Sequence, residues 1–227
     1  MPAVIVIPPL FNGLRAKGFF TTKAAGIDRN AVAKIAGVRT ADVYMPVQQH
    51  TDKVLCIDFD LDPKIADGVI TKRQGILIGV QVADCVPILL YDKKKQVTGA
   101  VHAGWRGTSG GILKIALMTM MEKFCSSAPD ILIAIGPSIK SCCYEVGHEV
   151  AAAVEKTSGG TDYSARKGEK YFIDLPSANK HQAFSLGIPP ENIWLSGECT
   201  SCRPEKYSSY RFEKGAAGRQ GGFIGIV

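Results

Sequence analysis

Residues 99–107, GAVHAGWRG, place an imidazole and a guanidinium directly after a strand-like apolar run. Residues 99–101 have the pattern of a buried strand, His102 ends it, and Arg106 follows in a glycine-containing turn. A side chain at the end of a rigid strand is held firmly while one side of it stays open. His102 is therefore a candidate for a functional site.

Two further segments carry a metal-capable or nucleophilic side chain beside residues that interrupt regular structure. His50 lies in QQHT, just before a β-like run, and Cys85 lies in ADCVP, between two apolar runs. Pro87 lacks an N–H and restricts the residue before it, which favours a strand junction at Cys85. We hypothesise that His50, Cys85 and His102 converge in the fold.

Two imidazoles and a thiol suit two kinds of chemistry. As ligands they form a zinc-type set that leaves a fourth position open, as catalytic sites do, and such a metal can activate water or polarise a substrate oxygen. Alternatively, Cys85 is a thiolate nucleophile with His50 or His102 as its base. The gaps of 35 and 17 residues match no local zinc motif. Spacing therefore leaves both open, beside ordinary core or surface roles.

Arg106 and the small residues after it suggest an anion site. Residues 107–111, GTSGG, precede a predicted helix, and a helix start beside an arginine can hold phosphate. We predict that Arg106, Gly107, Thr108 and Asp84 bind substrate or phosphate, with Asp84 also a candidate acid. A solvated arginine and a capped loop are the alternative.

The elements that must position these residues are a mixture of strands and helices. Apolar runs typical of strands occur at 3–7, 54–59, 68–71, 76–82, 88–91, 97–102 and 131–135. Helices are predicted over 113–124, 149–156 and 176–186, the last with Asp174 near its start and Gly187 after its end. Polar, glycine-rich residues 158–170 and 213–222 are expected to be loops. The pattern predicts an α/β or α+β fold.

The remaining cysteines are interpreted as structural. Cys199 and Cys202 have C-x-x-C spacing, but neither a second pair at zinc-ribbon distance nor a thioredoxin-like strand–helix unit accompanies them. Cys142 and Cys143 are adjacent and are interpreted as packing residues.

Composition predicts one globular domain over residues 1–227. The chain is 46% hydrophobic and 21% charged, which is typical of a protein with its own core. Seven cysteines and no export signal favour reduced thiols in the cytoplasm, and no apolar window is long enough for a membrane span. The net charge of +6 is spread out, apart from residues 93–95, which are expected in a solvated turn. We expect a monomer or weak homo-oligomer that binds small anions rather than nucleic acid or membranes.

Taken together, eight segments resemble the YfiH family, also called the polyphenol oxidoreductase or laccase-like family and, in newer naming, purine nucleoside phosphorylase. The segments are QQHTDKV, VADCVPILLYD, AVHAGWRGT, AIGPSIKSCCYEVG, YFIDL, CT, SSYR and GRQ. The match runs in order from about Gly18 to Arg219, and HAGWRG with ADCVP is the specific part. Residues 20–37 depart from the family's pattern, with Lys23 near its usual arginine and Ala25 in place of a glycine.

The resemblance implies a single α/β domain with mixed sheets packed between helices. It implies a zinc-type site in which His50, Cys85 and His102 are metal ligands and catalytic residues, with Cu²⁺ as a second candidate metal. The implied activity is phosphorolysis of adenosine, inosine, guanosine or methylthioadenosine, with adenosine deamination as a side activity. An amidase that edits cell-wall peptide precursors, using the thiol or a metal, is the alternative.

Copper-dependent polyphenol oxidation, also attributed to the family, is the least favoured activity. It needs several copper centres, and the chain has four histidines. Two of them, His148 and His181, fall in helical patterns with no evident partner.

Overall fold

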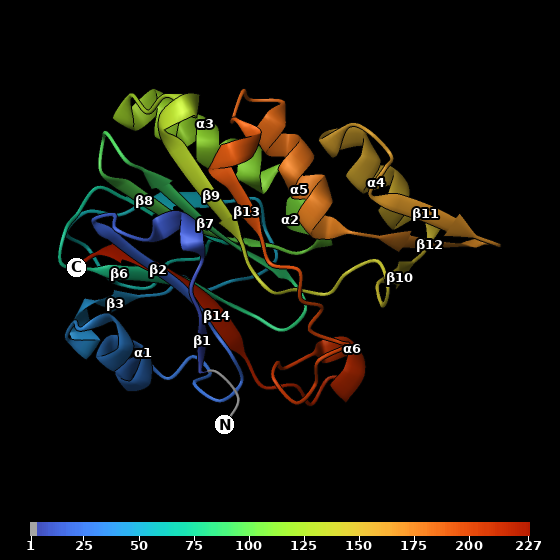
Figure 1. The fold of residues 1–227 in the computed structure, drawn as a ribbon, viewed down its shortest axis with the longest axis horizontal. Coiled ribbons are helices and arrows are strands. Elements are labelled where there is room, and N and C mark those ends of the chain that lie inside the picture. The colour runs from blue at the N-terminus through green and yellow to red at the C-terminus, as the bar shows by residue number, and fades with distance from the viewer. Residues whose placement is uncertain (1–3) are drawn as a thin grey trace.

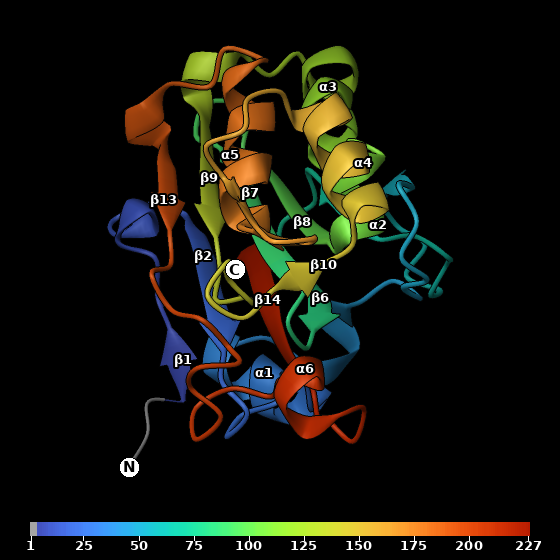
Figure 2. The ribbon, with the colours of Figure 1, turned by 90° about the vertical axis from the view of Figure 1, so that its right-hand side faces the viewer.

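The computed structural model describes residues 4–227 as two large β-sheets stacked between layers of helices (Figures 1 and 2). A six-stranded mixed sheet has the order β13 (Ile193–Leu195), β9 (Ile131–Ile135), β7 (Val86–Asp92), β8 (Val97–Ala103), β5 (Gly68–Thr71) and β4 (Val54–Cys56). A five-stranded sheet has the order β1 (Ile5–Val6), β2 (Ala16–Thr21), β14 (Gln220–Ile226), β6 (Leu77–Val82) and β3 (Val43–Tyr44). A small antiparallel sheet of β10 (Glu145–Val146), β12 (Lys170–Ile173) and β11 (Ser164–Lys167) projects to one side (Figure 1).

Helices cover the outer faces of the two large sheets. The helices are α1 (Arg29–Ala36), α2 (Trp105–Ser109), α3 (Ile112–Phe124), α4 (His148–Ser158), α5 (Leu175–Phe184) and α6 (Tyr210–Glu213). Single 3₁₀ turns lie at Pro9–Phe11, Thr40–Asp42, Ala128–Asp130 and Pro190–Asn192. Helix α1 packs on the five-stranded sheet, α3 and α5 pack on the six-stranded sheet, and α4 packs against α2, α5 and β12. The predicted α/β class, with mixed sheets between helices, is confirmed.

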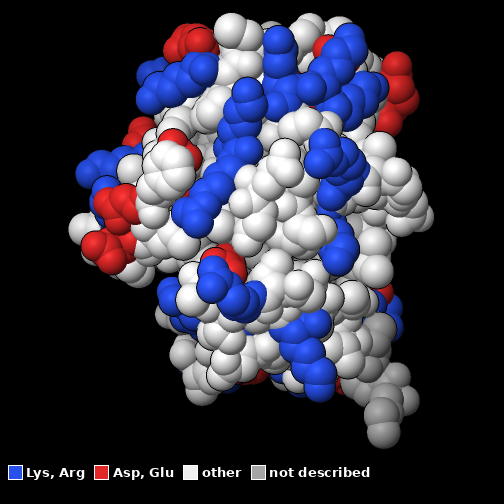
Figure 3. Space-filling model, turned by 90° about the vertical axis from the view of Figure 1, so that its left-hand side faces the viewer, with Lys and Arg blue, Asp and Glu red and all other residues white. Residues whose placement is uncertain are grey.

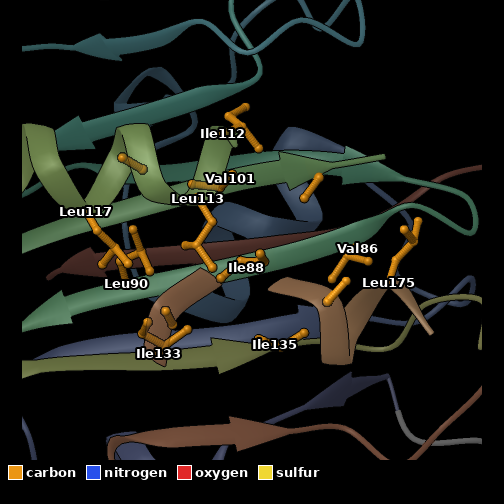
Figure 4. Packing of buried hydrophobic residues seen from close by; sticks show 14 of the residues in the cluster. Val86, Ile88, Leu90, Val101, Ile112, Leu113, Leu117, Ile133, Ile135 and Leu175 are labelled. Carbon is orange, nitrogen blue, oxygen red and sulfur yellow. The ribbon is translucent and has the colours of Figure 1, made fainter. Parts of the chain in front are cut away.

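Alternation along the strands divides the core into layers. In β7, Ile88 and Leu90 face α3, whereas Leu89 faces the five-stranded sheet. Figure 4 shows Leu113 and Leu117 of α3 against Ile88 and Leu90. Because both faces of β7 are covered, its sequence is a continuous apolar run, as the sequence pattern indicated.

Most of the predicted elements are present. The strands at 68–71 and 131–135 have the predicted bounds, and the other five predicted strands are present with shifted ends, although Ala3 lies outside the described residues. The three predicted helices are α3, α4 and α5, and the Asp174 side chain caps α5 by accepting a 2.9 Å hydrogen bond from the Ser177 N–H. The lysines of residues 93–95 are exposed in a turn, as expected.

Both predicted loops were partly wrong. Residues 158–170 include β11, whose polar side chains are mostly solvent-exposed. Residues 213–222 include the start of β14, a buried central strand. Its glycines are required by space, because a Cβ at Gly221 would lie 2.6 Å from the Val80 carbonyl oxygen and one at Gly225 would lie 2.3 Å from that of Ile76. Close packing of backbones, rather than loop flexibility, explains this composition.

The described residues contain no helix that is long and apolar enough to span a membrane. Figure 3 shows lysine and arginine side chains scattered over one side of the molecule among uncharged residues, in keeping with the net charge of +6.

Candidate active site

The three predicted ligands meet at one end of the sheet sandwich. One ligand atom each from His50, Cys85 and His102 lies within 4.8 Å of the others, and the two imidazole rings are edge-to-face with centroids 4.9 Å apart. His102 is on β8, while the other two lie on segments that cross between the sheets. Cys85 lies in the crossover from β6 to β7, and His50 lies in the crossover from β3 to β4. The predicted strand junction at Cys85 is confirmed.

Asp67, which we did not identify from the sequence, holds two of these ligands in place. It precedes β5 and is fully buried. Its Oδ1 lies 2.7 Å from His102 Nδ1 and accepts a 3.1 Å hydrogen bond from the His50 N–H. Its Oδ2 accepts hydrogen bonds from Gln49 N–H at 3.2 Å, and from Thr51 N–H at 2.6 Å and its hydroxyl at 2.8 Å. A carboxylate on Nδ1 leaves the His102 Nε2 for a metal or a proton transfer.

The three N–H groups around Asp67 come from consecutive residues, 49–51, and form a small anion nest. Within it His50 has a positive φ of 58°, a conformation that non-glycine residues adopt rarely. The hydrogen bonds to Asp67 therefore offset local backbone strain and aim the imidazole.

Gly104 leaves space beside the side chains of Cys85 and His50 because it has no Cβ. A Cβ there would lie 3.0 Å from Cys85 Sγ and 3.3 Å from His50 Cδ2. Its φ of −70° is open to any residue, so the backbone conformation itself does not require a glycine here. The glycine instead leaves room beside a soft sulfur and an imidazole, and these donors fit a zinc-type ion.

In the metal-free protein, the pKa of Cys85 is lowered and the pKa of His102 is raised from their usual values. Burial raises the pKa of the Cys85 thiol, but hydrogen bonds and positive charge from His102 and His50 outweigh it and bring that pKa from 9.0 to about 6. Burial lowers the pKa of His102, but Asp67 and Cys85 outweigh it and raise the pKa to about 9. Between these values Cys85 is a thiolate and His102 an imidazolium, an arrangement suited both to metal binding and to nucleophilic chemistry.

Alkylation of Cys85 in metal-stripped protein is expected to have its rate midpoint near pH 6 rather than near pH 9. The thiolate is the reactive form, so a lowered pKa moves the midpoint down. Iodoacetamide labelling at a series of pH values, with quantification of the Cys85 peptide, measures this. The exposed Cys56 provides the internal comparison, and a Cys85 midpoint as high as that of Cys56 would contradict the prediction.

A cavity of about 570 Å³ opens beside the three ligands. Arg106, Arg211 and Arg219 line it, all three exposed at its rim. Among residues 4–227, no carboxylate forms an ion pair with any of these guanidinium groups. Positive charge that no carboxylate of these residues neutralises makes the cavity suitable for an anionic ligand.

Aromatic side chains provide the apolar part of the wall. Trp105, Tyr144 and Tyr210 line the cavity, and the Arg106 guanidinium stacks 4.4 Å from the Trp105 ring centroid. Burial, followed by the nearby Cys85 sulfur, raises the pKa of Tyr144 to about 12, so its hydroxyl stays protonated. A flat, electron-rich base can stack on such rings.

Asp84 also lines the cavity, but both of its carboxylate oxygens are engaged. Oδ1 accepts a 2.6 Å hydrogen bond from the Thr200 hydroxyl, and Oδ2 accepts a 2.7 Å hydrogen bond from the Arg211 N–H. Asp84 has a positive φ of 82° and sits in the crossover that carries Cys85. Asp84 thus connects Thr200 and Arg211, near the C-terminus, with the segment that carries Cys85.

Gly107 and Thr108 are not among the residues that line the cavity. Both are buried in α2, and Thr108 is bonded to α5: its Oγ1 lies 3.0 Å from Asn179 Nδ2, and its carbonyl accepts a 2.7 Å bond from Gln182. The predicted helix, α3, does start directly after Gly111, but residues 107–109 of the preceding loop belong to the short helix α2, which starts after Gly104. Of the predicted phosphate-binding residues, the structure brings Arg106 and Asp84 to the cavity.

Other assignments from the sequence need correction. His181 has a partner, since its Nε2 lies 2.8 Å from Asp162 Oδ1. Lys23 directs its ammonium group to the Pro204 carbonyl and does not line the cavity. Cys142 and Cys143 are not simple packing residues, because they lie against Cys199 and Cys202 in a second sulfur cluster.

The layered α/β fold, with two imidazoles and a thiol beside a basic cavity, is the feature on which this chain can be compared with known proteins. The sequence profile of the multi-copper polyphenol oxidoreductase laccase family matches residues 22–227. The crystal structure of a hypothetical protein YfiH from Bacillus licheniformis superposes with a TM-score of 0.92 at 27% identity, over 99% of this chain and 97% of that one. The chain therefore belongs to the YfiH family of laccase-like proteins.

Two curated relatives are similar over most of their length. A purine nucleoside phosphorylase from Clostridium acetobutylicum is 41% identical over 186 residues, covering 81% of this chain and 76% of the relative. Adenosine deaminase RL5, from an unknown prokaryotic organism, is 37% identical over 199 residues, covering 81% of this chain and 74% of the relative.

Proposed function

We propose that this chain is a metal-dependent purine nucleoside phosphorylase that also deaminates adenosine. The proposed substrates are adenosine, inosine, guanosine and methylthioadenosine, together with phosphate. One observation carries the proposal: the cavity beside His50, Cys85 and His102 is ringed by three arginines without carboxylate partners. The names of the two curated relatives support both reactions.

In the proposed phosphorolysis, a phosphate oxygen bonds to C1′ of the ribose while the bond from C1′ to N9 of the purine breaks. The bonding electron pair leaves with the base, which takes up a proton, and ribose 1-phosphate forms. Arg106, Arg211 and Arg219, which line the cavity, would hold the phosphate. Trp105 and Tyr210 would stack on the base.

His50, Cys85 and His102 would hold the metal, and Zn²⁺ is the ion that their donor atoms favour, with Cu²⁺ second. When bound, it would supply a Lewis acid beside the cavity. Asp67 keeps His102 Nδ1 occupied, which fixes the ring for ligation. Asp84 already accepts two hydrogen bonds through its carboxylate oxygens, which favours a positioning role over proton donation.

Replacing Arg106 with alanine is expected to raise the KM for phosphate about 10–100-fold, since a charged hydrogen bond contributes roughly 1.5–3 kcal/mol. The KM for the nucleoside should change much less. Initial rates at varied phosphate concentration measure this. Arg29→Ala, an exposed arginine on α1 away from the cavity, is the matched control. An unchanged KM for phosphate in Arg106→Ala would contradict the proposal that Arg106 binds phosphate.

The test of the proposed function is product formation by the purified protein from inosine or adenosine, with and without phosphate. Chromatography should show hypoxanthine or adenine, with ribose 1-phosphate, only when phosphate is present. Conversion of adenosine to inosine and ammonia should proceed without phosphate. Absence of phosphate-dependent base release with every purine nucleoside would overturn the phosphorylase assignment.

An amidase acting on cell-wall peptide precursors is the second candidate. The thiolate–imidazolium pair of Cys85 and His102 favours it, because that pair resembles an activated nucleophile and its base. Such an activity would release its product from a peptide substrate in the absence of phosphate, which separates it from phosphorolysis. Polyphenol oxidation is not favoured, since His148 and His181 lie outside both metal-capable clusters of residues 4–227.

A further inference from the structure

A second sulfur cluster lies outside the candidate active site. Cys142, Cys143, Cys199 and Cys202 bring their Sγ atoms within 4.8 Å of one another. Cys202 Sγ is 3.5 Å from that of Cys142 and 3.3 Å from that of Cys143. These separations are far longer than the roughly 2.05 Å of a disulfide. The separations of 3.5 and 3.3 Å are slightly shorter than the roughly 3.8 Å between sulfurs in a tetrahedron with zinc–sulfur bonds of about 2.3 Å, and no pair of sulfurs in the cluster is more than 4.8 Å apart.

The fold explains how two distant pairs meet. Strands β9 and β13 are parallel neighbours, so the segments that follow them leave the sheet at the same edge. These segments run side by side, with a bridge between Ser138 and Cys199 and a 3.1 Å hydrogen bond from Thr200 N–H to the Ser138 carbonyl. The first segment delivers Cys142 and Cys143, and the second delivers the C-x-x-C pair in a turn.

We infer that these four cysteines form a structural tetrathiolate metal site, for Zn²⁺ or a similar soft divalent cation. All four positions of a tetrahedron are filled by the chain, which is typical of structural rather than catalytic sites. Cys142 and Cys202 are exposed, so an ion can reach the site from solvent.

The site would fasten one wall of the catalytic cavity. Arg211 donates to the carbonyl of Cys143 at 3.2 Å and to that of Glu145 at 3.1 Å, and it lies over the Tyr144 ring. Thr200, between the paired cysteines, donates to Asp84. The metal would thus clamp the segments that carry Tyr144 and Arg211 without itself contacting substrate. This role is independent of which reaction the cavity performs.

Cobalt binding to a Cys85→Ala background, which removes the active-site thiol, tests the inference. Protein reduced and held under anaerobic conditions should take up one Co²⁺ with intense thiolate-to-cobalt charge-transfer and tetrahedral d–d bands. Adding Cys142→Ser or Cys202→Ser should abolish those bands. Cys56→Ser and Cys125→Ser, at exposed cysteines outside the cluster, should leave them unchanged.

A second measurement does not depend on the folding of the serine variants. The Cys85→Ala protein retains six thiols, because the chain has seven. Saturation with Zn²⁺ should protect four of them from a thiol reagent and leave two reactive. Elemental analysis of wild-type protein should correspondingly approach two metal ions per chain. No tetrathiolate spectrum in the Cys85→Ala protein, or no thiols protected by zinc, would overturn the inference.

Discussion

Cys85→Ala is expected to lower kcat/KM for phosphate-dependent cleavage of inosine by about a thousand-fold. Cys85 is the central donor of the three, reached by both imidazoles, and its loss leaves two ligands that cannot hold a catalytic ion firmly. A Lewis-acid contribution of several kcal/mol corresponds to a rate factor of about this size. Because the alanine side chain is smaller and fits the same crossover, the thermal unfolding midpoint of the metal-free protein should change little.

Steady-state kinetics and metal content should be measured on the same samples of Cys85→Ala. Cys56→Ala, at an exposed cysteine on β4, is the matched control and should retain wild-type activity. One metal ion per chain should be lost with the activity. Full turnover by Cys85→Ala would remove the thiol from both the metal-dependent and the nucleophilic mechanism.

Asp67→Asn should weaken metal binding about 10–100-fold and lower the free energy of unfolding by about 3–5 kcal/mol. The carboxylate accepts hydrogen bonds from three backbone N–H groups and from His102. An asparagine amide would place an NH₂ group against some of these donors, leaving buried groups unsatisfied. His102 would also lose the carboxylate that fixes its ring. Both ligand histidines are therefore affected although neither is changed.

The effect of Asp67→Asn is measured by competition with a zinc chelator and by urea unfolding of the metal-free protein. Asp62→Asn, an exposed aspartate in the preceding loop, controls for loss of a negative charge. Wild-type zinc affinity in Asp67→Asn would show that the carboxylate does not position the ligands. Unchanged metal-free stability would show that the nest around it contributes little.

The sign of the pH effect at Asp67 follows from its pKa. Burial raises the pKa, but the hydrogen bonds to His102 and Thr51 outweigh it and lower it from 3.8 to about 2. The stability contributed by the carboxylate is fully present above pH 3.8 and is lost as pH falls through about 2.

Features of the fold and the site could be predicted from the sequence where they depend on residues close together in the chain, and not where they depend on contacts between distant segments. Strands such as β5 and β9 are continuous apolar runs, and the capping of α5 by Asp174 is local, so these were visible. The glycine-rich β14 was not visible as a strand. Its glycines are needed because carbonyl groups of β6 and of the residue preceding β6 lie too close for a Cβ. His50, Cys85 and His102 were identifiable from their chemistry at strand ends, but their convergence depends on the pairing of β7 with β8 and on the contacts of Asp67.

Asp67 and the cysteine cluster show the limit more sharply. Asp67 reaches His102 because β5 pairs with β8 in the register that opposes Gly68 and Val101. An acidic residue at the start of a fully apolar strand was the available signal, since such a group needs a partner when buried. The two cysteine pairs meet only through the parallel pairing of β9 with β13. Neither the pairing of β5 with β8 nor that of β9 with β13 can be predicted from the spacing of residues along the chain.

The two crossovers that carry His50 and Cys85 also have a consequence for biogenesis. Cys85 and His102 lie at neighbouring ends of the paired strands β7 and β8, and hydrogen bonds from residues 49–51 to Asp67 bring His50 to them. Before these contacts form, the chain presents isolated imidazoles and thiols with no common centre. Under the proposed function, capture of the metal ion would accordingly be a late event, which reports that the β7–β8 pairing and the Asp67 contacts are in place.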